Sequence, residues 1–388
     1  MAKINENDKT KTDSKKQKKR SVPGAGKSAA KGGTKPAKHF QPFSLARFLI
    51  SFIKITFVTA IVAAVIFGGI LINYAVSPID EENVSVTVDI PTGASFVRAA
   101  RILDEAGLIN NHFLFYSLAM VKKATRVIRA GEYEFNTSLT PGDVINKLMR
   151  GDIKNYLVTI PEDFTYREVA HRLGYFRLID EDTFLRLARD EKFLTSLGIP
   201  VDSIEGYLFP NTYLFNRSMS TSQIIRIMVS QFWKEVTPEM VEQAAEMGFT
   251  LHEVVTLASL IGKESGYHNE KTLISAVFHN RLKRNKRLQS DPTAVYDMED
   301  FQGKILRSHL RRESPYNTYV INGLPPGPIG NPGLASIKAA LNPAPVKYLY
   351  FVSQNDGTHA FSETLAQHNE AVRELRRLQR NAANQQDS

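Results

Sequence analysis

A single glutamate, Glu264, is the strongest candidate for acid–base chemistry in this sequence. Residues 250–253 (TLHE) form a capping box, which predicts a helix that begins at about residue 251. At about 100° per residue, Glu264 falls about 20° from Leu257 and about 60° from Ile261, on the flank of the apolar stripe. Gly266 is a natural residue to follow a helix end, so Glu264 is expected in the last turn.

Two effects favour the neutral form of this carboxyl group: partial burial and the negative end of the helix dipole. A carboxyl group that is protonated near neutral pH can act as the general acid in the cleavage of a glycosidic bond. The alternative is a surface glutamate beside Lys263 with no chemical role. The helix alone favours that simpler interpretation, so the segments around Glu264 must decide.

Polar and aromatic side chains follow on segments that are rich in turn residues. Residues 288–293 (LQSDPT) predict a polar turn, and eight of the eleven residues in 323–333 are Gly or Pro, which excludes helix and strand there. Sugars present hydroxyl edges and apolar faces, so such loops near one acid predict a carbohydrate site. The candidates for substrate contact or for orienting Glu264 are Gln289, Asp291, Asn317, Thr318, Tyr319 and, more weakly, Glu205. Asp291 has the equal alternative of starting a turn before Pro292.

Five segments in one order closely resemble the YceG-like family of endolytic murein transglycosylases. They are residues 205–213 (EGYLFPNTY), 258–264 (ASLIGKE), 280–296 (NRLKRNKRLQSDPTAVY), 316–333 (YNTYVINGLPPGPIGNPG) and 347–361 (KYLYFVSQNDGTHAF). The resemblance extends over roughly residues 85–375 and includes the N-terminal anchor. It implies a LysM-like module before a catalytic domain, cleavage of nascent peptidoglycan strands, and Glu264 as the catalytic residue.

Two positions depart from the family pattern. Gly262 stands where the family usually has the first Glu of E-K-E, and Asn211 stands where it has the Asp of F-P-D-T-Y. Neither replaces Glu264, but both cast doubt on a second carboxylate role at these sites.

The expected reaction is lytic cleavage of the β-1,4 bond between N-acetylmuramic acid and N-acetylglucosamine, which leaves a 1,6-anhydro end. Glu264 would serve first as acid and then as base, so the paired carboxylates of ordinary glycosidases are not required. We expect no cofactor and no metal. Peptidoglycan synthases or divisome proteins are possible partners that the sequence does not identify.

Two other functions compete with this one. A metal hydrolase would use Glu264 with His268, His252 and His279, but there is no H-E-x-x-H motif and Gly266 should break the helix. A non-catalytic peptidoglycan-binding divisome scaffold would explain Gly262 as part of a decayed site. The intact flanking motifs argue against decay.

The charge of the chain is concentrated at its N-terminus. The sequence has 49 Lys+Arg and 40 Asp+Glu, a balance of +9, but residues 1–47 hold 13 basic and 3 acidic residues, which is +10. The remaining residues carry 36 basic and 37 acidic side chains, or −1. A nucleic-acid-binding fold would carry its basic patch on the folded part, so we expect no nucleic-acid partner. The absence of cysteine excludes disulfides, thiolate metal sites and cysteine nucleophiles.

A membrane anchor follows the basic tail. Residues 55–72 are 18 residues without a charge, and about 20 apolar residues cross a bilayer. Basic residues precede this stretch and acidic residues follow it, which predicts a cytoplasmic N-terminus and residues 76–388 outside. The expected location is the inner (plasma) membrane, with a single pass and a catalytic domain on the extracytoplasmic, periplasmic side.

The predicted fold class is α+β. We expect a disordered basic tail (1–47), a transmembrane helix (48–75), a LysM-like α/β module (84–156) and a mixed α+β catalytic domain (157–385). A shift of 70 residues gives seven identities between 88–109 and 158–179, which indicates two strand–Pro–helix modules. A helix from 269 to 283, with Asn269 as N-cap, and a packing helix over 362–380 complete the elements. The last is expected to bury Leu365, Val372, Leu375 and Leu378.

Overall fold

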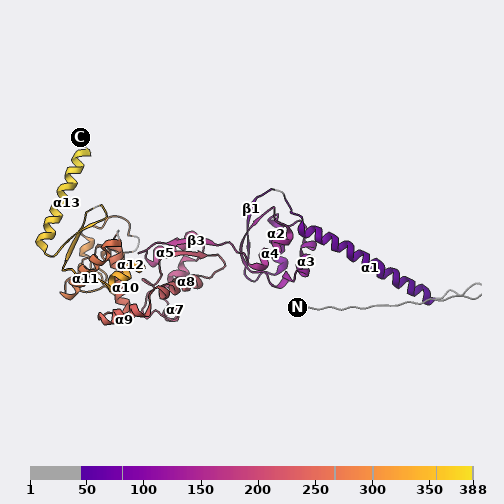
Figure 1. Ribbon diagram of the computed structural model, residues 1–388, viewed down its shortest axis with the longest axis horizontal. Helices are drawn as coiled ribbons and strands as arrows, with labels where there is room; N and C mark the ends of the chain where they lie inside the picture. Colours follow the sequence, from indigo (N-terminus) through magenta and orange to yellow (C-terminus); the bar gives the residue numbers. More distant parts are fainter. Residues whose placement is uncertain (1–44, 81, 266–267, 299–300, 355, 387–388) are drawn as a thin grey trace, which may run out of the picture. The chain divides into compact units, whose positions relative to one another are not determined.

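The computed structural model describes residues 45–386 apart from 81, 266–267, 299–300 and 355. The predicted disordered tail therefore lies outside the described residues over 1–44, and so does the predicted role of Gly266. The described chain is a mixed α+β structure, mostly helical, with three antiparallel sheets of two strands each (Figure 1). This confirms the predicted α+β class.

Helix α1 (Leu45–Val76) contains the uncharged stretch and is long and apolar enough to cross a membrane, which suits a single-pass anchor or a signal sequence. Almost all its side chains are exposed, and only Leu71 and Tyr74 near its end are buried. The contacts of the chain divide it within this helix into two units, Met1–Val65 and Ile66–Ser388.

The residues that follow α1 form a small hydrophobic cluster of their own. Strand β1 (Ser85–Ile90) pairs with β2 (Gly131–Asn136), and Val88 and Ile90 point into the cluster because side chains alternate along a strand. Three helices complete this part: α2 (Phe96–Glu105), α3 (His112–Val121) and α4 (Pro141–Arg150). Leu71 and Tyr74 of α1 belong to the same cluster.

The strand–Pro–helix pattern recurs in the structure as predicted. Strand β3 (Tyr156–Ile160) is followed by Pro161 and by α5 (Tyr166–Tyr175), and it pairs with β4 (Asn211–Phe215). Ser95 caps α2 and Thr165 caps α5 at equivalent positions, since each side chain accepts a hydrogen bond from the third residue along. These strands begin a second cluster that also holds α6 (Glu181–Leu187), α7 (Glu191–Ser196) and α8 (Thr221–Glu235).

Helix α10 (Leu251–Glu264) is the central helix of the second cluster, because every residue from Val254 to Gly262 is buried. Three helices pack against it: α9 (Pro238–Glu246), α11 (Lys271–Lys283) and α12 (Leu334–Leu341). Strand β5 (Tyr350–Ser353) contacts α11 and pairs with β6 (His359–Ser362), and α13 (Leu365–Gln386) contacts both strands. The Gly/Pro-rich segment 323–333 contains neither helix nor strand, as predicted.

Two predictions of detail are wrong. Helix α11 has Glu270 and not Asn269 at its N-cap, because a 3-10 turn over His268–Glu270 comes directly before it. Helix α13 leaves Leu365 and Leu378 more than half exposed, at 54% and 55%, so they form no packing face. Only Val372 and Leu375 of the predicted set are partly buried.

Candidate active site

The carboxyl group of Glu264 receives a short hydrogen bond from a side chain far along the sequence. Glu264 is the last residue of α10, whose start is fixed by the predicted capping box between Thr250 and Glu253. The hydroxyl of Ser290 donates to Glu264 Oε1 at 2.5 Å. Ser290 is fully buried, whereas Glu264 as a whole residue is partly exposed.

The surroundings hold Glu264 near the balance between acid and base. Burial raises the pKa of Glu264 to about 7, and the nearby charge of Asp291 also raises it. The hydrogen bond from Ser290 and the charge of Arg281 lower the same pKa. A group with this pKa can give up a proton and take one back near neutral pH, which general acid–base catalysis requires.

A network of hydroxyl groups fixes the turn that carries Ser290. The Ser290 N–H donates to Thr318 Oγ1 at 2.9 Å, and the Gln289 N–H donates to the Thr318 carbonyl at 3.1 Å. The hydroxyls of Thr318 and Thr293 share a hydrogen bond of 2.8 Å, and Thr293 Oγ1 also donates to the Ser290 carbonyl. The predicted polar turn 288–293 and the segment 316–319, which holds three of the candidate residues, thus form one hydrogen-bonded support for Glu264.

The remaining candidates divide by exposure. Gln289 and Asp291 are exposed on either side of the buried Ser290, which leaves them open to a substrate. Tyr319 is partly exposed, and its hydroxyl donates to Asp291 Oδ1 at 2.5 Å. Asn317 is fully buried; its amide group donates to the Arg312 carbonyl at 2.7 Å and its oxygen accepts the Tyr319 N–H at 3.1 Å. This geometry favours the orienting alternative for Asn317 and for the equally buried Thr318.

Sequence reasoning did not select Ser290 or Arg281. Arg281 is buried on α11, and its guanidinium donates to the carbonyls of Leu288 and Leu349 at 2.5 and 2.7 Å. It therefore joins the start of the Ser290 turn to the segment before β5. Ser290 lies between two selected residues, but its burial, which distinguishes it from both, is visible only in the structure.

Glu205 is buried away from solvent, at 1% exposed. Its carboxyl group accepts the Tyr166 N–H and the Asn331 amide at 2.9 Å each, and the Tyr296 hydroxyl at 2.8 Å. Burial raises the pKa of Glu205 to about 8. These contacts join α5, the Gly/Pro-rich segment and the residues after the Ser290 turn, so Glu205 is suited to support the loops rather than to contact a substrate.

The two departures from the family pattern have different surroundings. Asn211 is exposed at the start of β4, and its side-chain oxygen accepts the Thr212 N–H at 2.8 Å. Gly262 is buried, and the Asp163 carboxyl group lies directly against its backbone.

Two histidines of the competing metal hydrolase, His252 and His279, have partners within the chain. His279 Nε2 is 2.8 Å from the Ala340 carbonyl, and the two ring nitrogens of His252 are 3.1 Å from the Tyr207 hydroxyl and the Pro326 carbonyl. Among the residues that the structure describes, no group of three or more His, Asp or Glu could hold a metal ion.

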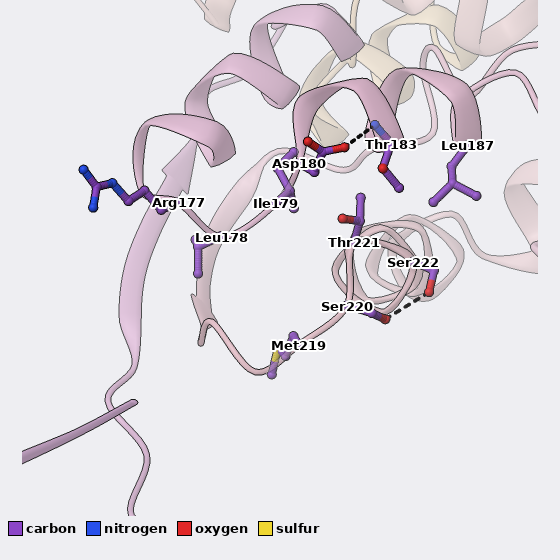
Figure 2. A pocket seen from close by; sticks show the side chains of 10 residues that line it. All are labelled: Arg177, Leu178, Ile179, Asp180, Thr183, Leu187, Met219, Ser220, Thr221 and Ser222. Carbon is purple, nitrogen blue, oxygen red and sulfur yellow. Dashed lines mark hydrogen bonds between the residues drawn. The ribbon is translucent and has the colours of Figure 1, made fainter. Parts of the chain in front are cut away.

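A separate pocket of about 510 Å³ lies between α6 and the start of α8 (Figure 2). Figure 2 shows that Asp180 and Ser220 turn back onto Thr183 and Ser222, and both residues also cap the helices that they precede. None of the residues around Glu264 lines this pocket.

A comparison with family models shows which family the chain is related to. The model of the YceG-like family matches residues 88–374. The chain belongs to the YceG-like family. Glu264, Ser290 and their supporting loops all lie within the matched residues.

Named relatives agree with this assignment. The chain is 31% identical over 79% of its length to the endolytic murein transglycosylase of Bacillus subtilis, and it covers 90% of that protein. It is 29% identical over 84% of its length to the endolytic murein transglycosylase of Streptococcus pneumoniae D39, and it spans 65% of that longer protein. A crystal structure of a yceG-like protein from Listeria monocytogenes matches 74% of this chain and 98% of its own, with 32% identity and a TM-score of 0.53.

Proposed function

We propose that this YceG-like protein is a membrane-anchored endolytic murein transglycosylase. It cleaves the β-1,4 bond between N-acetylmuramic acid and N-acetylglucosamine in nascent peptidoglycan strands, and so acts in cell wall assembly and chain termination. The observation that carries the proposal is the single carboxyl group of Glu264, held by Ser290 with a pKa of about 7. The names of the bacterial relatives support the same substrate.

The reaction needs one carboxyl group in two successive roles. Protonated Glu264 gives its proton to the oxygen that leaves with N-acetylglucosamine, while the glycosidic C–O bond breaks and positive charge develops on the muramoyl ring. The Glu264 carboxylate then takes the proton of the muramoyl C6 hydroxyl, whose oxygen bonds to C1 and closes the 1,6-anhydro ring. The proton returns to Glu264, so the cycle balances without water or a cofactor.

The other residues of the site have supporting roles in this proposal. Gln289, Asp291 and Tyr319 contact the glycan, and Ser290, Asn317 and Thr318 orient the acid. Helix α1 anchors the chain in the plasma membrane with the N-terminus in the cytoplasm. Residues 84–156 form the LysM-like module, and 157–385 form the catalytic domain.

The test uses the full-length chain with purified, uncrosslinked glycan strands. Glu264→Gln should keep the fold and abolish anhydro-ended products detected by mass spectrometry. Glu246→Gln, at an exposed glutamate on α9, is the matched control and should retain activity. Unchanged products from Glu264→Gln would reject the mechanism. Binding of glycan without cleavage by the unaltered chain would favour the non-catalytic scaffold instead.

A further inference from the structure

Helix α3 is apolar on both of its faces. Phe115, Leu118 and Ala119 are buried in the small cluster, as expected for a helix that packs against α2 and α4. The large apolar side chains on the other side are open to the surroundings: Phe113 is 68% exposed, Tyr116 40%, Met120 58% and Val121 70%. Positions 113, 116 and 120 share one face because they are three and four residues apart. A helix that is apolar all round is typical of a protein core or a membrane environment.

The outer end of α1 lies against the start of α3 (Figure 1). The rings of Phe67 and Phe113 meet edge to face with centroids 6.0 Å apart, and the Tyr74 hydroxyl donates to the Asn111 carbonyl at 3.3 Å. A Cβ atom at Gly142 of α4 would lie 2.7 Å from the Ala75 carbonyl oxygen, so the backbones are in close contact. The module therefore sits directly on this end of α1.

These contacts set the depth of α3 if α1 spans the bilayer, as proposed above. The uncharged stretch ends at Ile72, and Phe67 lies five residues before it. At 1.5 Å per residue, Phe67 is roughly 7 Å inside the end of that stretch. Interfacial helices bury their apolar faces about 5–10 Å into the boundary between headgroups and acyl chains. Phe113 contacts Phe67 and therefore lies at this depth.

Basic residues follow the apolar face directly. Lys123 and Arg126 are exposed just beyond the end of α3. Basic side chains at the edge of an apolar surface bind anionic lipid headgroups, and each contributes about 1 kcal/mol near such a membrane. The combination of apolar face, depth and charge fits a lipid surface better than a soluble protein partner.

We propose that α3 is an interfacial helix of the membrane. Phe113, Tyr116, Met120 and Val121 insert into the leaflet where α1 emerges, and Lys123 and Arg126 bind anionic headgroups beside them. The inference rests on the anchor proposed for α1, and it adds a second membrane contact from a different element.

Because the chain has no cysteine, single cysteines can report the environment of chosen positions without further changes. Met120→Cys in the full-length chain would carry an environment-sensitive fluorophore in vesicles of equal parts phosphatidylcholine and phosphatidylglycerol. Val62→Cys in α1 reports whether the anchor is inserted, and Tyr175→Cys, at a residue 78% exposed in the structure, reports a position in water. The two quenchers are lipids spin-labelled near the headgroup and aqueous iodide.

We expect the label at 120 to be quenched by the spin-labelled lipid and protected from iodide, unlike the label at 175. Lys123→Glu/Arg126→Glu should reduce this lipid quenching in vesicles that contain phosphatidylglycerol. If the label at 62 is quenched by lipid while that at 120 is quenched by iodide, the interfacial helix is rejected and the anchor stands. If the label at 62 is also quenched by iodide, α1 is not inserted in the bilayer. The proposed anchor and the interfacial helix are then both rejected. Protection from iodide without lipid quenching at 120 would indicate a protein partner or a second copy and would reject the proposal.

Discussion

The carboxyl group of Asp163 occupies the space beside Gly262. Gly262 lies on α10, two residues before Glu264. A Cβ atom at Gly262 would overlap Asp163 Oδ1. Asp163 has a φ of 67°, which is uncommon outside glycine, and its Oδ1 is buried without a hydrogen-bond partner among the described residues. The position of Asp163 therefore leaves no room for a side chain at residue 262. The packing at the end of α10, where Glu264 lies, depends on Gly262 and Asp163 together.

The first prediction tests this dependence. In a helix, Ala is usually more stabilising than Gly by about 1 kcal/mol. At Gly262 the overlap with Asp163 should reverse the sign, so that Gly262→Ala lowers the free energy of unfolding by about 1–3 kcal/mol. Asp163→Gly removes the carboxyl group and suits the positive φ. In that background, Gly262→Ala should become stabilising.

Thermal unfolding of the four proteins in detergent gives the double-mutant cycle. Equal effects of Gly262→Ala with and without the Asp163 carboxyl group would show that the two residues do not interact. Gly248 lies outside the helices, and a Cβ atom there would meet no atom within 4 Å. Because the φ of Gly248 is 81°, Gly248→Ala is a control for backbone strain without overlap.

The second prediction concerns stability and pH. The pKa of Glu264 is raised from 4.5 to about 7 in the fold, so the folded state holds more protons than the unfolded state between these values. Stability contributed by the neutral acid is therefore present below about pH 4.5 and is lost as the pH rises through about 7. Glu264→Gln stays neutral and should be more stable than the unaltered chain at pH 8, by on the order of 1–3 kcal/mol.

The measurement is the melting temperature of both proteins from pH 4 to pH 8. The difference should grow with pH and be small at the acid end, and Glu246→Gln should show no such trend. A difference that does not change with pH would contradict the raised pKa of Glu264.

The third prediction isolates the hydrogen bond from Ser290. This bond favours the carboxylate, so Ser290→Ala should raise the pKa of Glu264 further. A hydrogen bond to a charged group contributes about 1.5–3 kcal/mol, which corresponds to roughly one to two pKa units. Because the first step needs protonated Glu264, the fall in activity at high pH should move to higher pH.

The pH–rate profile of anhydro-product formation measures this shift. Ser308→Ala, at an exposed serine outside the network, is the control and should leave the profile unchanged. A lower rate with an unmoved profile would show that Ser290 supports the fold without tuning Glu264.

The fourth prediction separates orientation from substrate contact. Thr318→Val keeps the shape of the side chain but removes the hydroxyl that accepts the Ser290 N–H. Ser290 and Glu264 should lose their alignment, so kcat should fall by about 10- to 100-fold with little change in KM. Gln289→Ala and Asp291→Ala remove exposed groups and should mainly raise KM.

Initial rates over a range of glycan concentrations distinguish these cases. If Thr318→Val raises KM and leaves kcat intact, the buried threonine affects binding and the assigned division between the two groups of residues is wrong.

The sequence alone determined the features that depend on neighbours a few residues apart. The capping box at Thr250 and Glu253 fixed the start of α10, and helical periodicity placed Glu264 on the flank of its buried stripe. Composition determined the length and apolar character of α1, and the strand–Pro–helix repeat appeared with its caps at Ser95 and Thr165. Each rests on hydrogen bonds or side-chain spacing within one or two turns of chain.

Only the tertiary structure decided which groups meet Glu264 and what raises its pKa. Ser290 reaches Glu264 across 26 residues, and Asn331 reaches Glu205 across 126. No local pattern specifies such pairs, because they depend on where the packed helices and loops bring distant segments together. For the same reason Glu205, Asn317 and Thr318 could be selected from their residue types, whereas their burial became visible only in the fold. The pKa of Glu264 also depends on that enclosure, since burial is its main cause.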